Sequence, residues 1–165
     1  MTDTHIQSIG FTATRTMAPT GVSILRYQLI RLPVADRYVS GGARGGDAYI
    51  GWFLAGKYPK ARHTVIVPAD RSQVNPWWQI CPVPVEVIEM PEGTTYKDRN
   101  QAIVEKSGVL AGFPAHPEDH GQSRRSGTWQ TIRIARKEKM PVTWHTLMPP
   151  FTGDSSQLTD WRWGV

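Results

Sequence analysis

SGGARGGD, residues 40–47, is the stretch of this sequence that says most about its fold and its function. Four glycines allow positive φ and let a backbone approach a ligand closely. A helix start directly after them would offer unpaired N–H groups and a positive dipole end to an anion. Arg44 can add a bidentate phosphate contact, and Asp47 can cap the helix or accept a hydrogen bond from a ribose hydroxyl. We therefore predict a ligand-binding loop, with a plain glycine turn as the alternative, and take as its candidate contacts Ser40, Gly41, Gly42, Arg44, Gly45 and Asp47.

Strand-like and helix-like segments alternate on both sides of this loop. We expect strands at residues 6–11, 37–40, 63–67, 85–88, 108–113 and 142–145, and helices at residues 20–32, 47–58, 95–106 and 127–139. This order predicts an α/β fold, a single Rossmann-like domain with a mostly parallel sheet and helices on both faces. The domain is expected to cover residues 1–148. A tail at residues 149–165 carries Trp161 and Trp163, and we expect it to fold back or to reach a partner subunit.

Two further segments are expected at the carboxyl ends of strands, where ligands bind on open α/β sheets. The first, residues 10–15, ends the first strand and offers Gly10, Thr12 and Arg15 for a phosphate or sugar. The second opens the last long helix and offers three more candidate contacts, Ser126, Gly127 and Thr128. Each segment also reads as an ordinary turn or helix cap, so neither is decisive by itself.

Arg99 and Asn100 lie in the first turn of the predicted third helix. An arginine there opposes the helix dipole and therefore needs another reason to be present. We expect both residues to contact a phosphate or a base. The alternative is a local salt bridge from Arg99 to Asp98 or Glu105.

Composition sets limits on the class of protein. The chain has 165 residues, 39% hydrophobic and 20% charged, which is ordinary for a globular domain. A single cysteine, Cys81, excludes a disulfide-held secreted protein, and residues 1–7 lack a signal-peptide core, so we expect a cytoplasmic protein without a membrane partner. A net charge of +5 favours anionic partners. The five histidines lack metal-ligand spacing, so we expect no metal site.

These motifs, in this order, resemble the SLOG superfamily, the Rossmann-like group that contains the DNA processing protein A fold, the YspA-like proteins and the LOG phosphoribohydrolases. The resemblance covers residues 6–144 and rests on residues 10–15, 40–47, 99–100 and 126–128, with Ala135 further along the last helix. It implies a pocket for nucleotides or their derivatives between the glycine-rich loop and the Gly-Thr helix start. It also implies a homodimer or a higher homo-oligomer.

The resemblance leaves open whether the protein is an enzyme. In the phosphoribohydrolase branch a glutamate follows the Gly-Thr pair and acts with an upstream arginine. Here Arg99 is similar to that arginine, but Thr131 occupies the glutamate position.

Three functions follow as hypotheses. The first is binding or sensing of a nucleotide or another nucleotide-derived phosphate ligand. The sequence indicates no cofactor besides this ligand. The second is a DNA-processing-type protein that binds single-stranded DNA through Arg124, Arg125 and Arg133. The third is a nucleotide N-glycosidase that uses a different acid, and its candidates are Asp47, Asp98 and Glu105.

Overall fold

The computed structural model describes residues 5–153 and contains one parallel sheet of six strands. The strands are β1 (Ile6–Ala13), β2 (Ala35–Ser40), β3 (Arg62–Val67), β4 (Val85–Glu89), β5 (Val109–Phe113) and β6 (Val142–Trp144). The helices are α1 (Pro19–Ile30), α2 (Gly46–Lys57), α3 (Tyr96–Glu105) and α4 (Gly127–Lys137), with short 3-10 turns η1 (Trp77–Gln79) and η2 (Gly121–Arg125). The predicted alternation of strands and helices is confirmed, with shifts of one or two residues at most of the boundaries.

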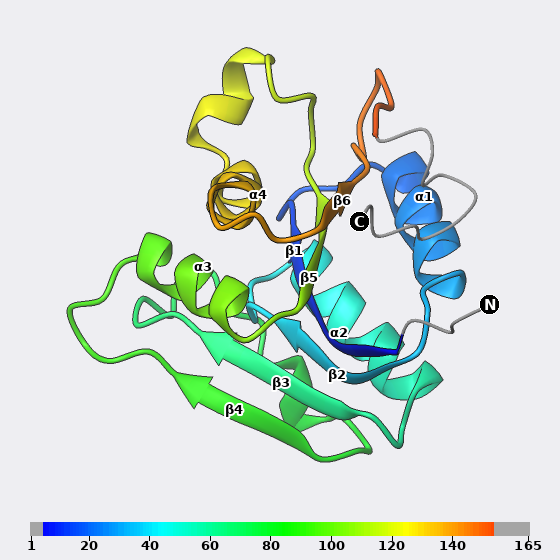
Figure 1. Cartoon of the computed structure of the whole chain (residues 1–165), viewed down its shortest axis with the longest axis vertical. Helices are drawn as coiled ribbons and strands as arrows, with labels where there is room; N and C mark the ends of the chain where they lie inside the picture. Colours follow the sequence, from blue (N-terminus) through cyan, green and yellow to red (C-terminus); the bar gives the residue numbers. More distant parts are fainter. Residues whose placement is uncertain (1–4, 154–165) are drawn as a thin grey trace.

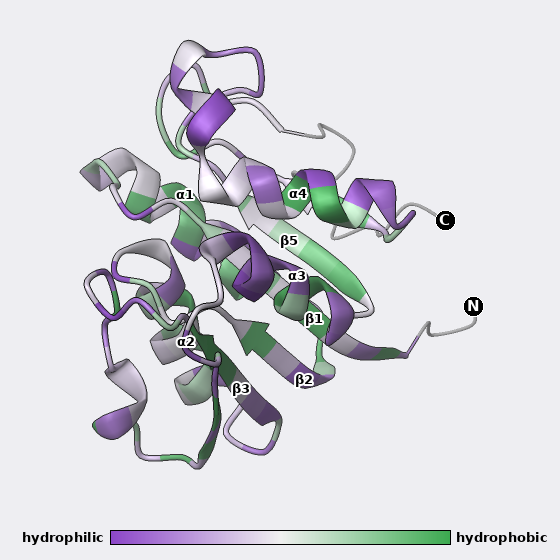
Figure 2. Cartoon of the chain, turned by 90° about the vertical axis from the view of Figure 1, so that its left-hand side faces the viewer, coloured by the Kyte–Doolittle hydropathy of each residue, from purple (hydrophilic) through white to green (hydrophobic). Residues whose placement is uncertain are grey.

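All five strand pairings are parallel, and the strand order is β4-β3-β2-β1-β5-β6. Helices α1 and α2 pack on one face of the sheet, where Leu25 and Ile50 belong to one apolar cluster. Helices α3 and α4 pack on the other face through a second cluster that includes Ile103 and Ile132 (Figure 1). Strand β5 is hydrophobic along most of its length (Figure 2), as expected of a parallel strand covered on both faces.

The connection between β3 and β4 contains η1 instead of a long helix. Trp77 in this connection is only 5% exposed and packs against α2. A Cβ atom on Gly51 of α2 would lie 2.3 Å from the Trp77 ring, so a glycine is what admits the indole here. Trp77 therefore covers an edge of the core.

The strand order reverses between β1 and β5. The chain leaves β1 toward α1 on one face, and leaves β5 toward α4 on the other. The backbone N–H of Thr14 donates to the carbonyl of Phe113 at 2.9 Å, which holds the two strand ends together. A crevice at the carboxyl ends of strands is expected at such a point.

The predicted tail extends past the described part of the chain. Trp161 and Trp163 lie outside it. The structure describes the chain after β6 as far as Gly153, which forms an antiparallel bridge with His145. No helix within residues 5–153 has the length and apolar character that crossing a membrane requires.

Candidate functional site

A pocket of about 630 Å³ lies at the carboxyl ends of β1 and β5, where the strand order reverses. Its walls come from the loops after β1 and β2, the first turn of α3, the segment at residues 115–126 and the first turn of α4. The predicted site residues that line it are Thr12, Arg15, Arg44, Asp47, Arg99, Asn100, Ser126, Gly127 and Thr128. The structure therefore brings together residues from all four predicted motifs.

Five predicted site residues do not line the pocket: Gly10, Ser40, Gly41, Gly42 and Gly45. Ser40 is buried in β2, and the glycines pack against the protein itself. A Cβ on Gly10 would lie 2.1 Å from the Ser107 hydroxyl oxygen, and one on Gly42 would lie 2.9 Å from Val65. Contacts within the chain thus require a small residue at these positions, and the predicted ligand contacts of the glycines stay predictions.

Asp47 and Arg99 form the buried centre of the site. Nη1 of Arg99 lies 3.6 Å from Oδ2 of Asp47 and donates to the carbonyl of Gly41 at 2.5 Å. The Asp47 side chain is 6% exposed and the Arg99 side chain is 9% exposed. A Cβ on Gly41 would lie 1.9 Å from Nη1 of Arg99, so this glycine makes room for the guanidinium. The partner of Arg99 is therefore neither Asp98 nor Glu105, the local alternatives that the sequence offers.

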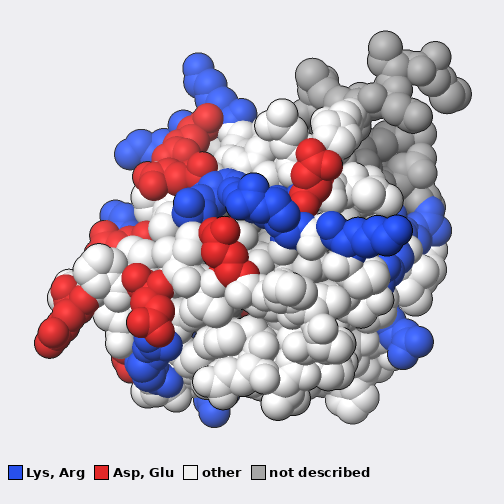
Figure 3. All heavy atoms as spheres, turned by 90° about the horizontal axis from the view of Figure 1, so that it is seen from below, with Lys and Arg blue, Asp and Glu red and all other residues white. Residues whose placement is uncertain are grey.

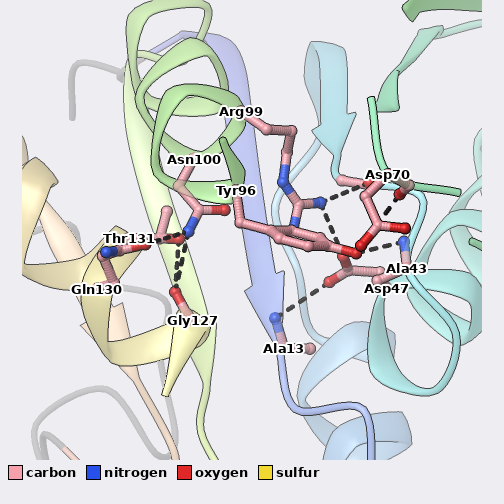
Figure 4. A network of polar contacts seen from close by, with 11 residues as sticks. Ala13, Ala43, Asp47, Asp70, Tyr96, Arg99, Asn100, Gly127, Gln130 and Thr131 are labelled. Atoms are coloured by element: carbon pink, nitrogen blue, oxygen red, sulfur yellow. Dashed lines mark hydrogen bonds and ion pairs between the residues drawn. The ribbon is translucent and has the colours of Figure 1, made fainter. Parts of the chain in front are cut away.

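The Asp47 carboxylate also fixes two backbone segments. It accepts hydrogen bonds from the N–H of Ala13 at 3.2 Å and from the N–H of Ala43 at 3.4 Å (Figure 4). The helix cap position is held by Gly45 without a side-chain bond, so Asp47 does not cap α2. Burial raises the pKa of Asp47, while the nearby Arg99 guanidinium and these two N–H groups oppose that rise. Asp47 thus connects the end of β1, the glycine-rich loop and α3.

Asn100 joins α3 to the start of α4. Its amide nitrogen donates to the Gln130 side-chain oxygen at 2.9 Å and to the carbonyl of Gly127 at 3.4 Å (Figure 4). Asn100 is 2% exposed, so this bond lies in the interior. Asn100 therefore positions the start of α4 relative to α3, and its predicted contact with a base or phosphate stays a prediction.

The first turn of α4 faces the pocket. Ser126 caps this helix, since its hydroxyl accepts from the N–H of Trp129 at 3.3 Å. The N–H groups of Gly127 and Thr128 are two of the first-turn donors that an α-helix leaves without intrahelical partners. Both residues line the pocket. The helix start therefore presents donors and a positive dipole end to whatever the pocket holds.

Four arginines line the pocket: Arg15, Arg44, Arg99 and Arg125. Asp47 is the one acidic residue in the lining. Arg99 is paired with it, whereas the other three arginines are exposed and make no ion pair with a side chain in the described part of the chain. The pocket therefore has an excess of positive charge.

Ion pairs partly neutralise the basic residues late in the chain, among them Arg133, a candidate DNA contact, and Arg136. Glu118 lies 2.6 Å from Arg136 and 4.0 Å from Arg133. Figure 3 shows another side of the molecule, seen from below and away from α4, and there Lys and Arg side chains lie beside Asp and Glu side chains. Arg125 at the pocket is thus better placed for an anion than Arg133.

Several lining residues are not indicated by the sequence. Tyr96 lies beside Arg99, with the guanidinium carbon 5.8 Å from its ring centroid. His116 is half-buried at the pocket wall and stacks on His120 with ring centroids 4.0 Å apart. Nothing local in the sequence links these two histidines to the glycine-rich motifs. Gln130 is the third such residue.

The acids considered for hydrolysis are not gathered at the site. Asp98 forms a capping box with Thr95 at the start of α3, and Glu105 accepts from Gln101 on that helix. Thr131, at the position of the catalytic glutamate in the phosphoribohydrolase branch, is fully buried and donates to the carbonyl of Gly127 at 2.9 Å. Asp47 alone of the three acids lines the pocket. The described residues contain no group of three or more side chains suited to a metal ion.

Trp129 connects the pocket wall to the core. It is 1% exposed, and its indole N–H donates to the carbonyl of His116 at 2.8 Å. Trp129→Phe keeps a ring in the core but removes this donor, so we expect the free energy of unfolding to fall by about 1–2 kcal/mol. Urea unfolding measures this, with faster amide exchange in residues 115–126 as a second readout. Unchanged exchange there would contradict the anchoring role.

Sequence comparisons do not place the chain in a family. It matches no protein-family model. It also matches no curated protein.

Solved structures do match the fold. DNA processing protein A from Helicobacter pylori, described by its unique single-stranded DNA binding mode, aligns with a TM-score of 0.58 at 18% identity over 85% of this chain. The same protein from Streptococcus pneumoniae aligns with a TM-score of 0.59 at 16% identity over 84% of this chain. This chain spans 65% of the first protein and 50% of the second.

A molybdenum cofactor binding protein from Rippkaea orientalis aligns with a TM-score of 0.55 at 19% identity, over 86% of this chain and 77% of that protein. Identities this low show a shared fold and nothing about a shared ligand. The likeness agrees with the resemblance carried by the glycine-rich motifs. The chain therefore has the Rossmann-like fold that is found in DNA processing protein A.

Proposed function

We propose that this protein binds a nucleotide or a nucleotide-derived phosphate ligand in the pocket at the ends of β1 and β5. The observation that carries the proposal is the convergence of four arginines and the start of α4 on one cavity. Arginine matches phosphate geometry through paired N–H groups, and a helix N-terminus adds backbone donors. The volume of the pocket, about 630 Å³, is within the usual range for small-molecule sites.

The test is a thermal-shift panel of nucleotides, nucleotide sugars, dinucleotides and oligo-deoxythymidine, with chromatography of each ligand after incubation. A ligand at 100 times its dissociation constant stabilises the folded state by about 2.7 kcal/mol. We expect at least one small nucleotide to stabilise the protein. Recovery of that nucleotide intact supports binding, and its cleavage would support the hydrolase hypothesis instead.

A pair of variants tests the location. We expect Arg44→Ala to weaken binding about 10-fold or more, because a charge-assisted contact to phosphate is lost. Arg26→Ala is the matched control, since Arg26 is an exposed arginine of α1 that does not line the pocket. Equal binding by both variants would exclude this pocket as the site.

Single-stranded DNA is the second candidate. The likeness to the Helicobacter pylori protein favours it, and so does the placement of Arg124 and Arg125, both exposed, in η2 at the pocket rim. If single-stranded DNA is the ligand, we expect oligo-deoxythymidine alone to stabilise the protein in the thermal-shift panel. Its affinity should then fall steeply as the salt concentration rises. The pairing of Glu118 with Arg133 and Arg136 favours the small ligand, because it takes basic charge away from a DNA-binding surface.

A further inference from the structure

The charge balance of the pocket narrows the class of ligand. Four arginines and one aspartate are the charged side chains of its lining. When Asp47 is ionised, the lining keeps an excess of three positive charges. Like charges gathered around one cavity repel each other, so this excess favours a ligand of matching negative charge.

The four arginines come from four different segments. Arg15 follows β1, Arg44 follows β2, Arg99 is in α3 and Arg125 is in η2. One phosphate group is compact, whereas the four lining arginines belong to the loops after β1 and β2, to α3 and to η2. The arrangement therefore suits anionic groups at more than one point of the ligand.

Unused donors in the interior give an independent indication. Arg99 is only 8% exposed, and its Nε atom is buried without a hydrogen-bond partner among the described residues. Thr128 also lines the pocket and forms no side-chain hydrogen bond with the described residues, so its hydroxyl is available to a ligand there. Buried polar groups without partners are uncommon, so a site with such groups is prepared for a polar ligand.

We propose that the pocket selects ligands with two or more phosphate groups, the class of the nucleoside diphosphates, over ligands with one phosphate. The inference rests on the proposed function and specifies its ligand. A terminal phosphate carries about −1.5 to −2 charges at pH 7, so a single phosphate leaves about one positive charge of the lining uncompensated. A second phosphate supplies that charge and reaches arginines that the first does not.

The experiment compares matched pairs by calorimetric titration at constant ionic strength, without divalent cations. The probes are inorganic phosphate against pyrophosphate, and AMP, GMP, CMP and UMP each against its diphosphate. We expect each diphosphate to bind about 10- to 100-fold more tightly than its monophosphate, the effect of one further charge-assisted contact. Pyrophosphate should exceed phosphate by a similar factor.

Variants separate specific contacts from general attraction. We expect Arg125→Ala to reduce the diphosphate-to-monophosphate ratio by about 10-fold, and Arg26→Ala to leave it unchanged. Equal affinities within every pair would overturn the inference and leave the proposed function standing. A ratio that Arg125→Ala does not change would also overturn it, since the preference would then not depend on the arginines of this pocket. Failure of every probe to bind would overturn this inference, whereas the proposed function fails only if the nucleotides, nucleotide sugars and dinucleotides of the thermal-shift panel do not bind either.

Discussion

Arg99→Met is expected to lower the free energy of unfolding by about 3–5 kcal/mol at pH 7, because it leaves a buried carboxylate without its counter-charge. Asp47 is 4% exposed, and Nη1 of Arg99 is the cation beside it at 3.6 Å. Methionine fills much of the same volume, so the expected loss comes from charge and hydrogen bonding. The carbonyl of Gly41 also loses its donor. Urea unfolding at several pH values measures the effect.

The size of this loss should depend on pH. Burial raises the folded-state pKa of Asp47, and the Arg99 guanidinium opposes the rise. A group with a raised folded-state pKa contributes stability that is fully present below its unfolded pKa, about 3.9 for aspartate, and is lost as the pH rises through the folded pKa. Without Arg99 the folded pKa is higher still. We therefore expect the gap between wild type and Arg99→Met to be small near pH 4 and to widen toward neutrality.

Two further proteins complete this test. The double variant Asp47→Asn with Arg99→Met has no buried charge, so it should be more stable than Arg99→Met alone at pH 7. Arg71→Met removes an exposed pair with Glu89, whose atoms lie 2.8 Å apart, and should change stability by less than about 1 kcal/mol. Equal losses in Arg99→Met and Arg71→Met, or a gap that does not change with pH, would contradict the role given to the buried pair.

The sequence predicts the elements well because their signals are local. Apolar periodicity predicts each strand and each helix. The glycines at residues 41–46 predict the turn into α2. The argument that an arginine in the first turn of α3 needs a special reason is also right. Its partner could not be identified, since Asp47 lies far from Arg99 in the sequence and meets it only after the sheet forms. The pocket wall at residues 115–126 has no local signal either, because it depends on the anchoring of Trp129.

The glycine-rich loop shows the same limit. The sequence predicts that its glycines admit a ligand, and this stays a prediction; the structure shows that they make room for other parts of the chain. At Gly41 the neighbour is the Arg99 guanidinium, and at Gly46 it is Ala13, whose Cβ would lie 2.4 Å from an added Cβ. Both explanations require small residues at the same positions. A sequence therefore cannot separate them without knowing which segments meet.

Of the glycines in this loop, Gly45 is the one where we expect a side chain to cost most stability. Gly45→Ala should lower the free energy of unfolding by about 2–5 kcal/mol. Gly45 has φ of +81° and ψ of −125°, a conformation that only glycine adopts without strain. An added Cβ would lie 2.3 Å from the carbonyl oxygen of Arg15. The backbone of the loop after β1 is not free to move away, since the N–H of Gly46 donates to the carbonyl of Thr14 at 2.9 Å.

Gly56→Ala is the matched control for this substitution. Gly56 lies in α2 with nothing within 4 Å of an added Cβ, so alanine there should stabilise the protein by about 0.5–1 kcal/mol. Urea unfolding of both variants gives the comparison. Pyrophosphate titration of folded Gly45→Ala gives a second readout, because displacement of Arg15 should weaken binding. If Gly45→Ala were as stable as wild type, the close approach of the two loops would not be the reason for glycine at this position, and contact with the ligand would again be the better explanation.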